Sequence, residues 1–242
     1  RSAQNRRSFK PKQYPDKLEA MKALWLEEAK KNNALPLDDR TTMQIITTPR
    51  PTEEKEKDSY TYYPHTSQVP EAVAVNVRGK SFKIISNVEI SADAKGVIFA
   101  HGSRFGGHSL FIKDHKLYYV YNFLGIKQQQ LVSTEVLKPG KYTFGLEFIK
   151  EKAGEHGESI GTAKLYINDK AVATGAMTAQ VGKFTLVGDG LCVGFDSGDP
   201  VSKEYSSPGE FEGGEISFVT VNTGKEQYLD LEREAARAFS KE

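Results

Sequence analysis

The chain has 242 residues, which is enough for one large β domain, or for one domain with an appendage, and for a substantial buried core. Its formal net charge of +1 gives no bulk electrostatic case for binding nucleic acid or an anionic membrane. It contains no run of about 18 apolar residues, so no membrane span is predicted.

Residues 1–34 are predicted to be a basic tail followed by one helix. The chain begins with Arg1 and not with Met, so we expect a processed or trimmed piece of a longer polypeptide. The predicted helix covers Asp16 to Asn32, with Asp16 as N-cap and Glu19 completing a capping box. Apolar residues at three- and four-residue spacing form one face of it: Leu18, Met21, Trp25 and Ala29. An amphipathic helix of this kind must bury that face against something.

Residues 35–70 are predicted to be an irregular linker. The segment holds five prolines and a charge run between Glu53 and Asp58. About 35 residues without a periodic pattern are too many for an ordinary turn. We therefore expect a connection that wraps a surface.

Residues 71–242 carry the pattern of short strands and end in a second amphipathic helix, 226–242. Alternating apolar residues are clearest between Gly96 and Leu124, and turn signals such as Asn168-Asp169 separate the runs. The predicted strands are Ala72–Val77, Phe82–Ile90, Val97–His101, His108–Lys113, Lys116–Phe123, Gln130–Glu135, Tyr142–Lys150, Ala163–Ile167, Lys170–Thr174, Leu191–Gly194 and Ile216–Val221. Many short strands without crossover helices predict a mostly β fold. The expected form is an antiparallel two-sheet sandwich of jelly-roll type, concanavalin- or laminin-G-like, with one helix at each end.

The first candidate site lies between the third and fourth of these predicted strands. His101, Arg104 and His108 flank three glycines, which let the backbone approach a ligand closely. The planar guanidinium of Arg104 suits sulfate, phosphate or carboxylate, so an anion or sugar site is one interpretation. A glycine-rich hairpin with solvated polar side chains is the alternative. A zinc site that adds His115 has less support, because the three histidines fall on different loops.

A second candidate is the loop Gly194 to Pro200. Asp196 and Asp199 could supply oxygen ligands to calcium, but the same residues are preferred in ordinary turns. No metal site is therefore predicted.

Catalytic residues are not predicted in this chain. Two of Glu210, Glu212 and Glu215 could form a glycosidase-like carboxylate pair, but Gly213-Gly214 is expected to break or bulge the strand that presents them. An acidic, solvated edge is the simpler interpretation. Cys192 is alone, which excludes an internal disulfide, and its apolar context predicts an inert buried thiol.

Several ordered blocks resemble the C-terminal region of large bacterial arylsulfatases. The blocks are GVIFAHGSRFGGHSLFIKDHKLYYVYNFLG, GLCVGFDSGDPVSKEY, GGEISFVTVNTG and YLDLEREAARAF. The segment YPDKLEAMKALWLEEAKKNNALPLDDR resembles the closing helix and exit loop of the catalytic domain in the same family. The resemblance covers nearly the whole chain from about Tyr14.

The resemblance implies a sulfate ester hydrolase as the parent protein, from a bacterium and either cytoplasmic or periplasmic. In that family the nucleophile is a formylglycine made from Cys or Ser in a C/S-x-P-x-R motif, beside a calcium ion. The motif is absent here: Cys192 is not followed by Pro and Arg at the required positions, and the serine version at Ser206 has Glu210 where Arg is needed. Formylglycine and calcium are therefore expected only in a catalytic domain that is missing from this sequence.

The main functional hypothesis is an accessory portion of an arylsulfatase that is inactive alone. It would support the catalytic domain, the substrate entrance or oligomer contacts, and its junction candidates are Trp25, Asp38, Asp39 and Arg40. The alternative is a carbohydrate-binding jelly-roll module, with sulfated glycans as a candidate ligand, and a glycoside hydrolase is a third hypothesis. The expected partners are the sulfatase catalytic domain, a glycan or sulfate ester, or a second copy, and not nucleic acid.

Overall fold

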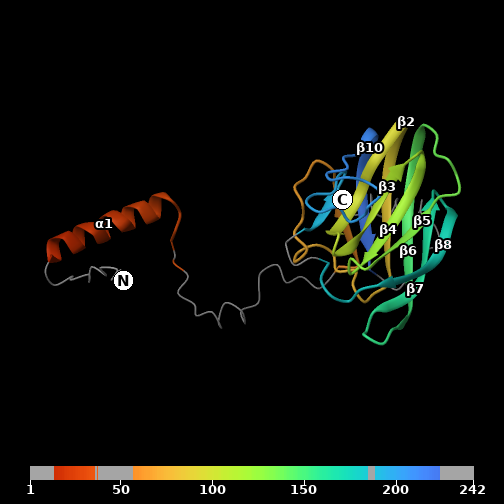
Figure 1. The fold of residues 1–242 in the computed structure, drawn as a ribbon. Helices are drawn as coiled ribbons and strands as arrows, with labels where there is room; N and C mark the ends of the chain where they lie inside the picture. Colours follow the sequence, from red (N-terminus) through yellow and green to blue (C-terminus); the bar gives the residue numbers. More distant parts are fainter. Residues whose placement is uncertain (1–13, 36, 38–56, 185–188, 224–242) are drawn as a thin grey trace, which may run out of the picture. The chain divides into compact units, whose positions relative to one another are not determined.

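A computed structural model describes residues 14–35, 37, 57–184 and 189–223 (Figure 1). The chain divides into two compact units, Arg1–Lys55 and Glu56–Glu242. The basic tail, the junction candidates Asp38, Asp39 and Arg40, and the expected C-terminal helix lie outside the described residues.

The first unit contains helix α1, Pro15–Lys31. The helix begins at Pro15 and its N-cap is Tyr14, so Asp16 lies in the first turn and is not the predicted cap. Proline suits this position because the first helical N–H groups have no partner inside the helix. Trp25 lies on the apolar face with 48% of its surface exposed. Among the described residues, no helix has the length and apolar character needed to cross a bilayer.

The second unit is a sandwich of two antiparallel sheets (Figure 1). Its strands in chain order are β1 (Ser59–Tyr62), β2 (Phe82–Ser103), β3 (Gly106–Lys113), β4 (Lys116–Phe123), β5 (Lys127–Val132), β6 (Gly140–Ala153), β7 (Ser159–Ile167), β8 (Lys170–Ala179), β9 (Leu191–Val193) and β10 (Glu212–Asn222). Sheet A has the order β1-β10-β2-β6-β7-β8, and sheet B has the order β9-β2-β3-β4-β5. The predicted mostly β, antiparallel, jelly-roll-type fold is confirmed.

The long strand β2 belongs to both sheets. Its first half, up to Ile90, pairs with β6 and β10, and its second half, from Gly96, pairs with β3. Between the halves the register with β10 shifts, because Gly214 is opposite Ile90 while Glu212 is opposite Lys95. A Cβ on Gly213 would lie 2.8 Å from the Cα of Ala94, so only glycine lets the bent strand and β10 approach this closely. The strands predicted separately at Phe82–Ile90 and Val97–His101 are therefore parts of one bent strand.

Two further segments differ in type from the sequence predictions. The linker predicted over 35–70 contains β1, which pairs with β10 at the edge of sheet A. Tyr60 and Tyr62 of this strand pack against the core. Conversely, the strand predicted at Ala72–Val77 is a turn segment. Val75 and Val77 are buried nonetheless, whereas Val73 is exposed, and the N–H of Val75 donates to the hydroxyl of Tyr62 at 2.9 Å. These two valines are buried although the segment pairs with no strand, and their two-residue spacing gave the sequence its strand-like pattern.

The main core fills the space between the sheets. Its largest fully buried members are aromatic, including Phe99, Tyr119 and Phe144. A smaller core lies on the outer face of sheet B, where Val201 and Tyr205 pack against side chains such as Phe111. The loop that follows β9 therefore covers this face of the sandwich.

Candidate functional site

His101 and His108 lie in the main core and not on a surface loop. They are opposite each other on β2 and β3, and each exposes at most 1% of its surface. Their rings pack edge-on and tilted against Phe184, and the Nδ1 of His108 lies 3.1 Å from the hydroxyl of Tyr119. The predicted surface site built on these histidines is therefore wrong. Alternation along β2 and β3 places both side chains on the inner face of the sheet, where each histidine fills a position in the core.

Burial also decides the protonation of the two histidines. Desolvation lowers the pKa of His101 to about 3, and the positive charge of Arg78 lowers it further. Desolvation lowers the pKa of His108 well below its usual value too, with His101 adding to the effect. Both rings are neutral at pH 7. Because His115 lies in the exposed β3–β4 turn, and no group of three or more metal-binding side chains occurs in the described residues, the three histidines do not form a zinc site.

Arg104 occupies the two-residue turn between β2 and β3. Its Nε lies 3.1 Å from the Oδ2 of Asp199, and both side chains are largely exposed, at 62% and 45%. The guanidinium carbon also lies 4.7 Å from the centre of the Phe105 ring. The structure therefore joins two of the predicted site residues in an exposed ion pair, away from the two histidines.

Asp196 is a buried structural carboxylate. Its Oδ2 accepts hydrogen bonds from the Tyr205 hydroxyl at 2.6 Å and from the Val201 N–H at 2.8 Å. Desolvation raises the pKa of Asp196 to about 6, and the two hydrogen bonds offset part of that rise. Its Oδ2 faces these donors inside the covering loop while Asp199 pairs with Arg104, so the two carboxylates that were considered as calcium ligands have separate protein partners.

The three glutamates near the chain end do not form a catalytic pair on one strand face. Glu212 is paired with Lys95 at 3.1 Å, and the bulge at Gly213 separates it from Glu215. Glu210 precedes the strand and lines, with Glu212, a groove of about 510 Å³ between the covering loop and the end of β3. The predicted bulge is confirmed.

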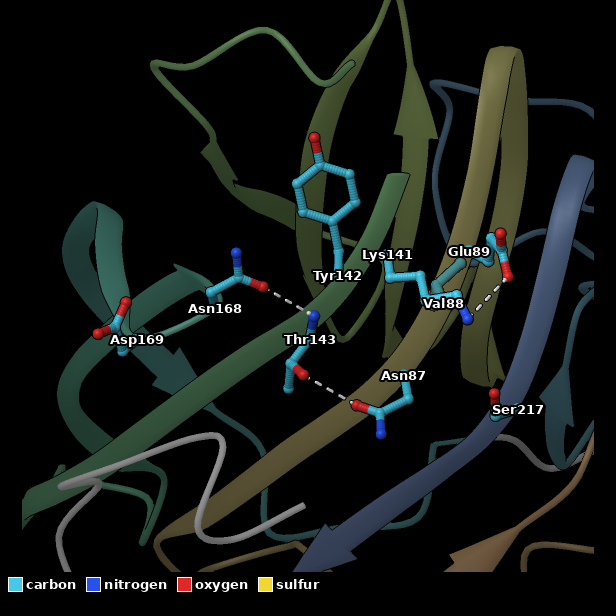
Figure 2. Close-up of a pocket in the computed structure, with 9 residues that line it drawn as sticks. All are labelled: Asn87, Val88, Glu89, Lys141, Tyr142, Thr143, Asn168, Asp169 and Ser217. Atoms are coloured by element: carbon cyan, nitrogen blue, oxygen red, sulfur yellow. Dashed lines mark hydrogen bonds and ion pairs between the residues drawn. The ribbon is translucent and has the colours of Figure 1, made fainter. Parts of the chain in front are cut away.

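A polar groove of about 480 Å³ lies on the solvent-facing side of sheet A (Figure 2). It is formed where β2, β6 and β10 run side by side and where the β7–β8 turn meets them. Its lining residues are Asn87, Val88, Glu89, Lys141, Tyr142, Thr143, Asn168, Asp169 and Ser217. Its volume is within the usual range for small-ligand sites.

Cross-strand neighbours form the floor of this groove. Asn87 is opposite Thr143 in the β2–β6 register, and the Thr143 hydroxyl donates to the Asn87 side-chain oxygen at 2.9 Å. Asn168 extends the β6–β7 ladder: its N–H donates to the Thr143 carbonyl at 2.7 Å, and its side-chain oxygen accepts from the Thr143 N–H at 3.0 Å. Its φ of 56° is one that asparagine tolerates well. Figure 2 draws the two bonds that involve side chains, and the three bonds together hold Asn87, Thr143 and Asn168 in place.

Several hydrogen-bonding groups remain unused at the groove. The Asn87 side-chain nitrogen, the Asp169 carboxylate and the Ser217 hydroxyl have no hydrogen-bond partner in the described part of the chain. Ser217 is the extra residue of a bulge between Ile216 and Phe218. The groove therefore offers donors, acceptors and a hydroxyl at fixed positions.

Charge in the groove is slightly negative. Lys141 and Glu89 are opposite each other and form an exposed pair at 3.6 Å, and Asp169 adds a second carboxylate. Tyr142 does not provide a stacking surface here, because its ring stacks on Phe144 and its hydroxyl donates to the Lys138 carbonyl. Figure 2 shows this ring turned away from Asn87 and Ser217.

Sequence reasoning did not find this groove. Its polar residues come from four separate segments, near positions 87, 141, 168 and 217, and none belongs to a motif. Asn168-Asp169 was recognised only as a turn.

No protein-family model matches the chain, and no curated protein matches it. Among solved structures, it is similar to the heptameric SAP-like pentraxin from Limulus polyphemus (16% identity, TM-score 0.38, covering 67% of this chain and 75% of that one). It is also similar to domains LG4–5 of the mouse laminin α1 chain (15% identity, TM-score 0.41, 72% and 43% coverage). A third is the receptor-binding domain of botulinum neurotoxin D (10% identity, TM-score 0.43, 76% and 44% coverage). The chain thus spans less than half of the laminin and neurotoxin chains, and no function is carried over from these likenesses.

Proposed function

We propose that the sandwich is a non-catalytic carbohydrate-binding module whose ligand lies in the polar groove of sheet A. The observation that carries the proposal is the set of unused groups on Asn87, Asp169 and Ser217. Sugar hydroxyl groups both donate and accept hydrogen bonds, so different hydroxyls of one glycan can meet the amide N–H, the carboxylate and the hydroxyl along the groove. Such a site binds by hydrogen bonds and bridging water, with little apolar contact.

The charges of the groove narrow the ligand class. One ammonium group faces two carboxylates, so a sulfated sugar would meet net repulsion while a neutral sugar would not. Neutral glycans therefore fit this groove better than the sulfated glycans considered from the sequence. Arg104, the anion-binding candidate, is engaged by Asp199.

Blocking the groove tests this proposal. Ser217 is exposed at the bulge, so Ser217→Tyr is expected to fill the groove while leaving the fold intact. Calorimetric titration with neutral oligosaccharides, selected first on a glycan array, should show at least about a tenfold loss of affinity, equivalent to about 1.4 kcal/mol. Ser67→Tyr, on an exposed loop that does not line the groove, is the matched control. Equal affinities for both variants, or binding of sulfated glycans alone, would contradict the proposal.

We also propose, as a second candidate, that the chain is the accessory portion of an arylsulfatase. The ordered blocks that resemble this family support it; in the fold they cover β2 from Gly96 onward, β3, β4, β9 with the loop after it, and most of β10. In this role the module would present glycan or sulfate-ester substrates to a separate catalytic domain.

The second candidate predicts that the purified chain does not hydrolyse aryl sulfates. No C/S-x-P-x-R sequence is present to provide the nucleophile. Release of 4-nitrophenol from 4-nitrophenyl sulfate should equal the buffer blank, with an intact arylsulfatase as positive control. Hydrolysis of 4-nitrophenyl sulfate that persists through purification and is proportional to the protein concentration would contradict the non-catalytic assignment.

A further inference from the structure

Two adjoining turns of sheet B expose apolar side chains at one end of the sandwich. Phe105 lies in the β2–β3 turn, Leu124 and Ile126 lie in the β4–β5 turn, and Val181 follows β8. Their exposed fractions are 49%, 47%, 80% and 47%. We call these four residues the turn patch. Exposed apolar residues that cluster in this way mark interaction sites more often than isolated ones do.

The two turns are in backbone contact. A Cβ on Gly125 would lie 2.9 Å from the Arg104 carbonyl oxygen and 3.4 Å from the Phe105 Cα. The Gly125 N–H donates to the side-chain oxygen of Asn122, and the side-chain nitrogen of Asn122 donates to the Arg104 carbonyl at 2.9 Å. Asn122, buried to 2% exposure, therefore ties the β4–β5 turn to the β2–β3 turn.

A second buried amide connects the third segment of the patch. The side-chain oxygen of Gln180 accepts from the Leu124 N–H at 3.1 Å, and its nitrogen donates to the Lys183 carbonyl at 2.8 Å. Leu124 itself has a φ of 53°, a region that a branched side chain rarely adopts. Strained backbone held by buried hydrogen bonds is enriched at functional positions. The patch is thus presented rigidly, which lowers the entropic cost of binding.

Basic side chains surround the turn patch. Arg104, Lys127, Lys183 and Lys203 are exposed around it; Lys203 lies next to the β5 strand, where its N–H donates to Gln128. The nearby carboxylates are Asp189 and Asp199, and Asp199 is engaged by Arg104. Because Arg104 and Asp199 offset each other, the three lysines against Asp189 give the rim a surplus of positive charge, which attracts an anionic surface.

The size of the turn patch decides the class of partner. Four partly exposed side chains offer on the order of a few hundred Å², well below the ~800 Å² per partner of a stable protein interface. A few apolar side chains at turn tips, with lysines at their sides, are in contrast sufficient for reversible insertion at a bilayer interface. We propose that the turn patch binds the surface of an anionic lipid bilayer, with Phe105, Leu124 and Ile126 entering the headgroup–acyl boundary and the lysines contacting the headgroups.

The test uses the full chain and sedimentation with vesicles. Phosphatidylcholine vesicles that contain a minor fraction of phosphatidylserine should bind the protein, pure phosphatidylcholine should bind it weakly, and added salt should reduce binding. The double variant Phe105→Ser/Ile126→Ser should lose at least about tenfold in vesicle affinity. Val73→Ser/Val136→Ser, which also removes two exposed valines but outside the patch, should bind like the wild type.

Further variants keep the proposal falsifiable. Lys127→Glu/Lys203→Glu should weaken binding to the anionic vesicles without removing an apolar side chain. Trp25→Ser in α1 reports on the exposed apolar face of that helix. No vesicle binding, equal binding by wild type and Phe105→Ser/Ile126→Ser, or loss of binding only in Trp25→Ser would each overturn the proposal. Self-association that depends on Phe105 and Ile126, without vesicle binding, would overturn it in favour of a protein partner. All of these outcomes are independent of glycan binding.

Discussion

Lowering the pH from 7 to 4 is expected to destabilise the sandwich through His101 and His108. Both rings are buried, and desolvation lowers both pKa values, that of His101 to about 3. The unfolded chain binds a proton at each histidine below about pH 6.5, while the folded protein does not. Stability from these groups is therefore complete above pH 6.5 and is lost as the pH falls. For His101 alone the loss between pH 6.5 and 4 is about 3 kcal/mol, from 1.36 kcal/mol per pH unit.

The variant His101→Phe isolates this effect. Both ring nitrogens of His101 lack a hydrogen-bond partner, so an apolar ring of similar shape is expected to raise the free energy of unfolding by about 1 kcal/mol at pH 7. The gain should grow to about 4 kcal/mol at pH 4, since the variant no longer takes up that proton on unfolding. Urea denaturation followed between pH 7 and pH 4 measures both quantities.

A matched control is His156→Gln, which changes an exposed histidine in the β6–β7 loop and should leave the pH profile unchanged. If wild type and His101→Phe lose stability in parallel as the pH falls, the buried-histidine explanation fails.

Replacing Asp196 by alanine is expected to cost about 3 kcal/mol of unfolding free energy at pH 7. The substitution leaves the Val201 N–H without its acceptor and leaves the Tyr205 hydroxyl with only the Ser109 hydroxyl oxygen, at 2.9 Å, and it removes the anchor of the loop that covers sheet B. Asp199→Ala is the matched control in the same loop. Its carboxylate is exposed and only pairs with Arg104, so the expected cost is below about 0.5 kcal/mol. Equal losses in the two variants, or a calcium-dependent gain in stability that both abolish, would favour the calcium-binding interpretation instead.

The pH dependence at Asp196 has the opposite sign to that of the histidines. Its pKa is raised to about 6 in the folded protein, so the folded state holds this proton more tightly than the unfolded state. Between about pH 3.8 and pH 6 its contribution to stability falls as the pH rises. Two histidines destabilise the folded state as the pH falls and one aspartate stabilises it, so the net effect of these three groups is destabilisation by acid.

The strand pattern was readable because alternation reflects burial. Phe99, Leu110 and Tyr119 alternate with other residues along their strands, and all three lie in the core. The same signal misled at Ala72–Val77, where Val75 and Val77 are buried from a turn segment. It could not show that Phe82–Ile90 and Val97–His101 are one strand, because the bend is fixed by the contact of Gly213 with Ala94, more than 100 residues away in the chain.

Candidate site residues were harder to place than strands. A histidine beside glycines gives the same local pattern whether it faces solvent or the core, and partners on β3, β4 and the segment ending at Phe184 enclose His101 and His108. The turn-like sequence around Asp196 is compatible with a metal ligand, with a solvent-facing side chain and with a buried hydrogen-bond acceptor. The structure shows the last of these, with Tyr205 and Val201 as donors.

By itself, the sequence determined the fold class, the turn at Asn168-Asp169, the bulge at Gly213-Gly214 and the lack of a sulfatase nucleophile, because each depends on residue type and local spacing. Only the tertiary structure decided which polar residues share a surface. Asn87 and Ser217 lie 130 positions apart, yet β2 and β10 run side by side and bring them to one groove, and Asn122 and Gln180 join three separate segments into the turn patch. Strand pairing across long stretches of chain sets such neighbours, and no local pattern records it.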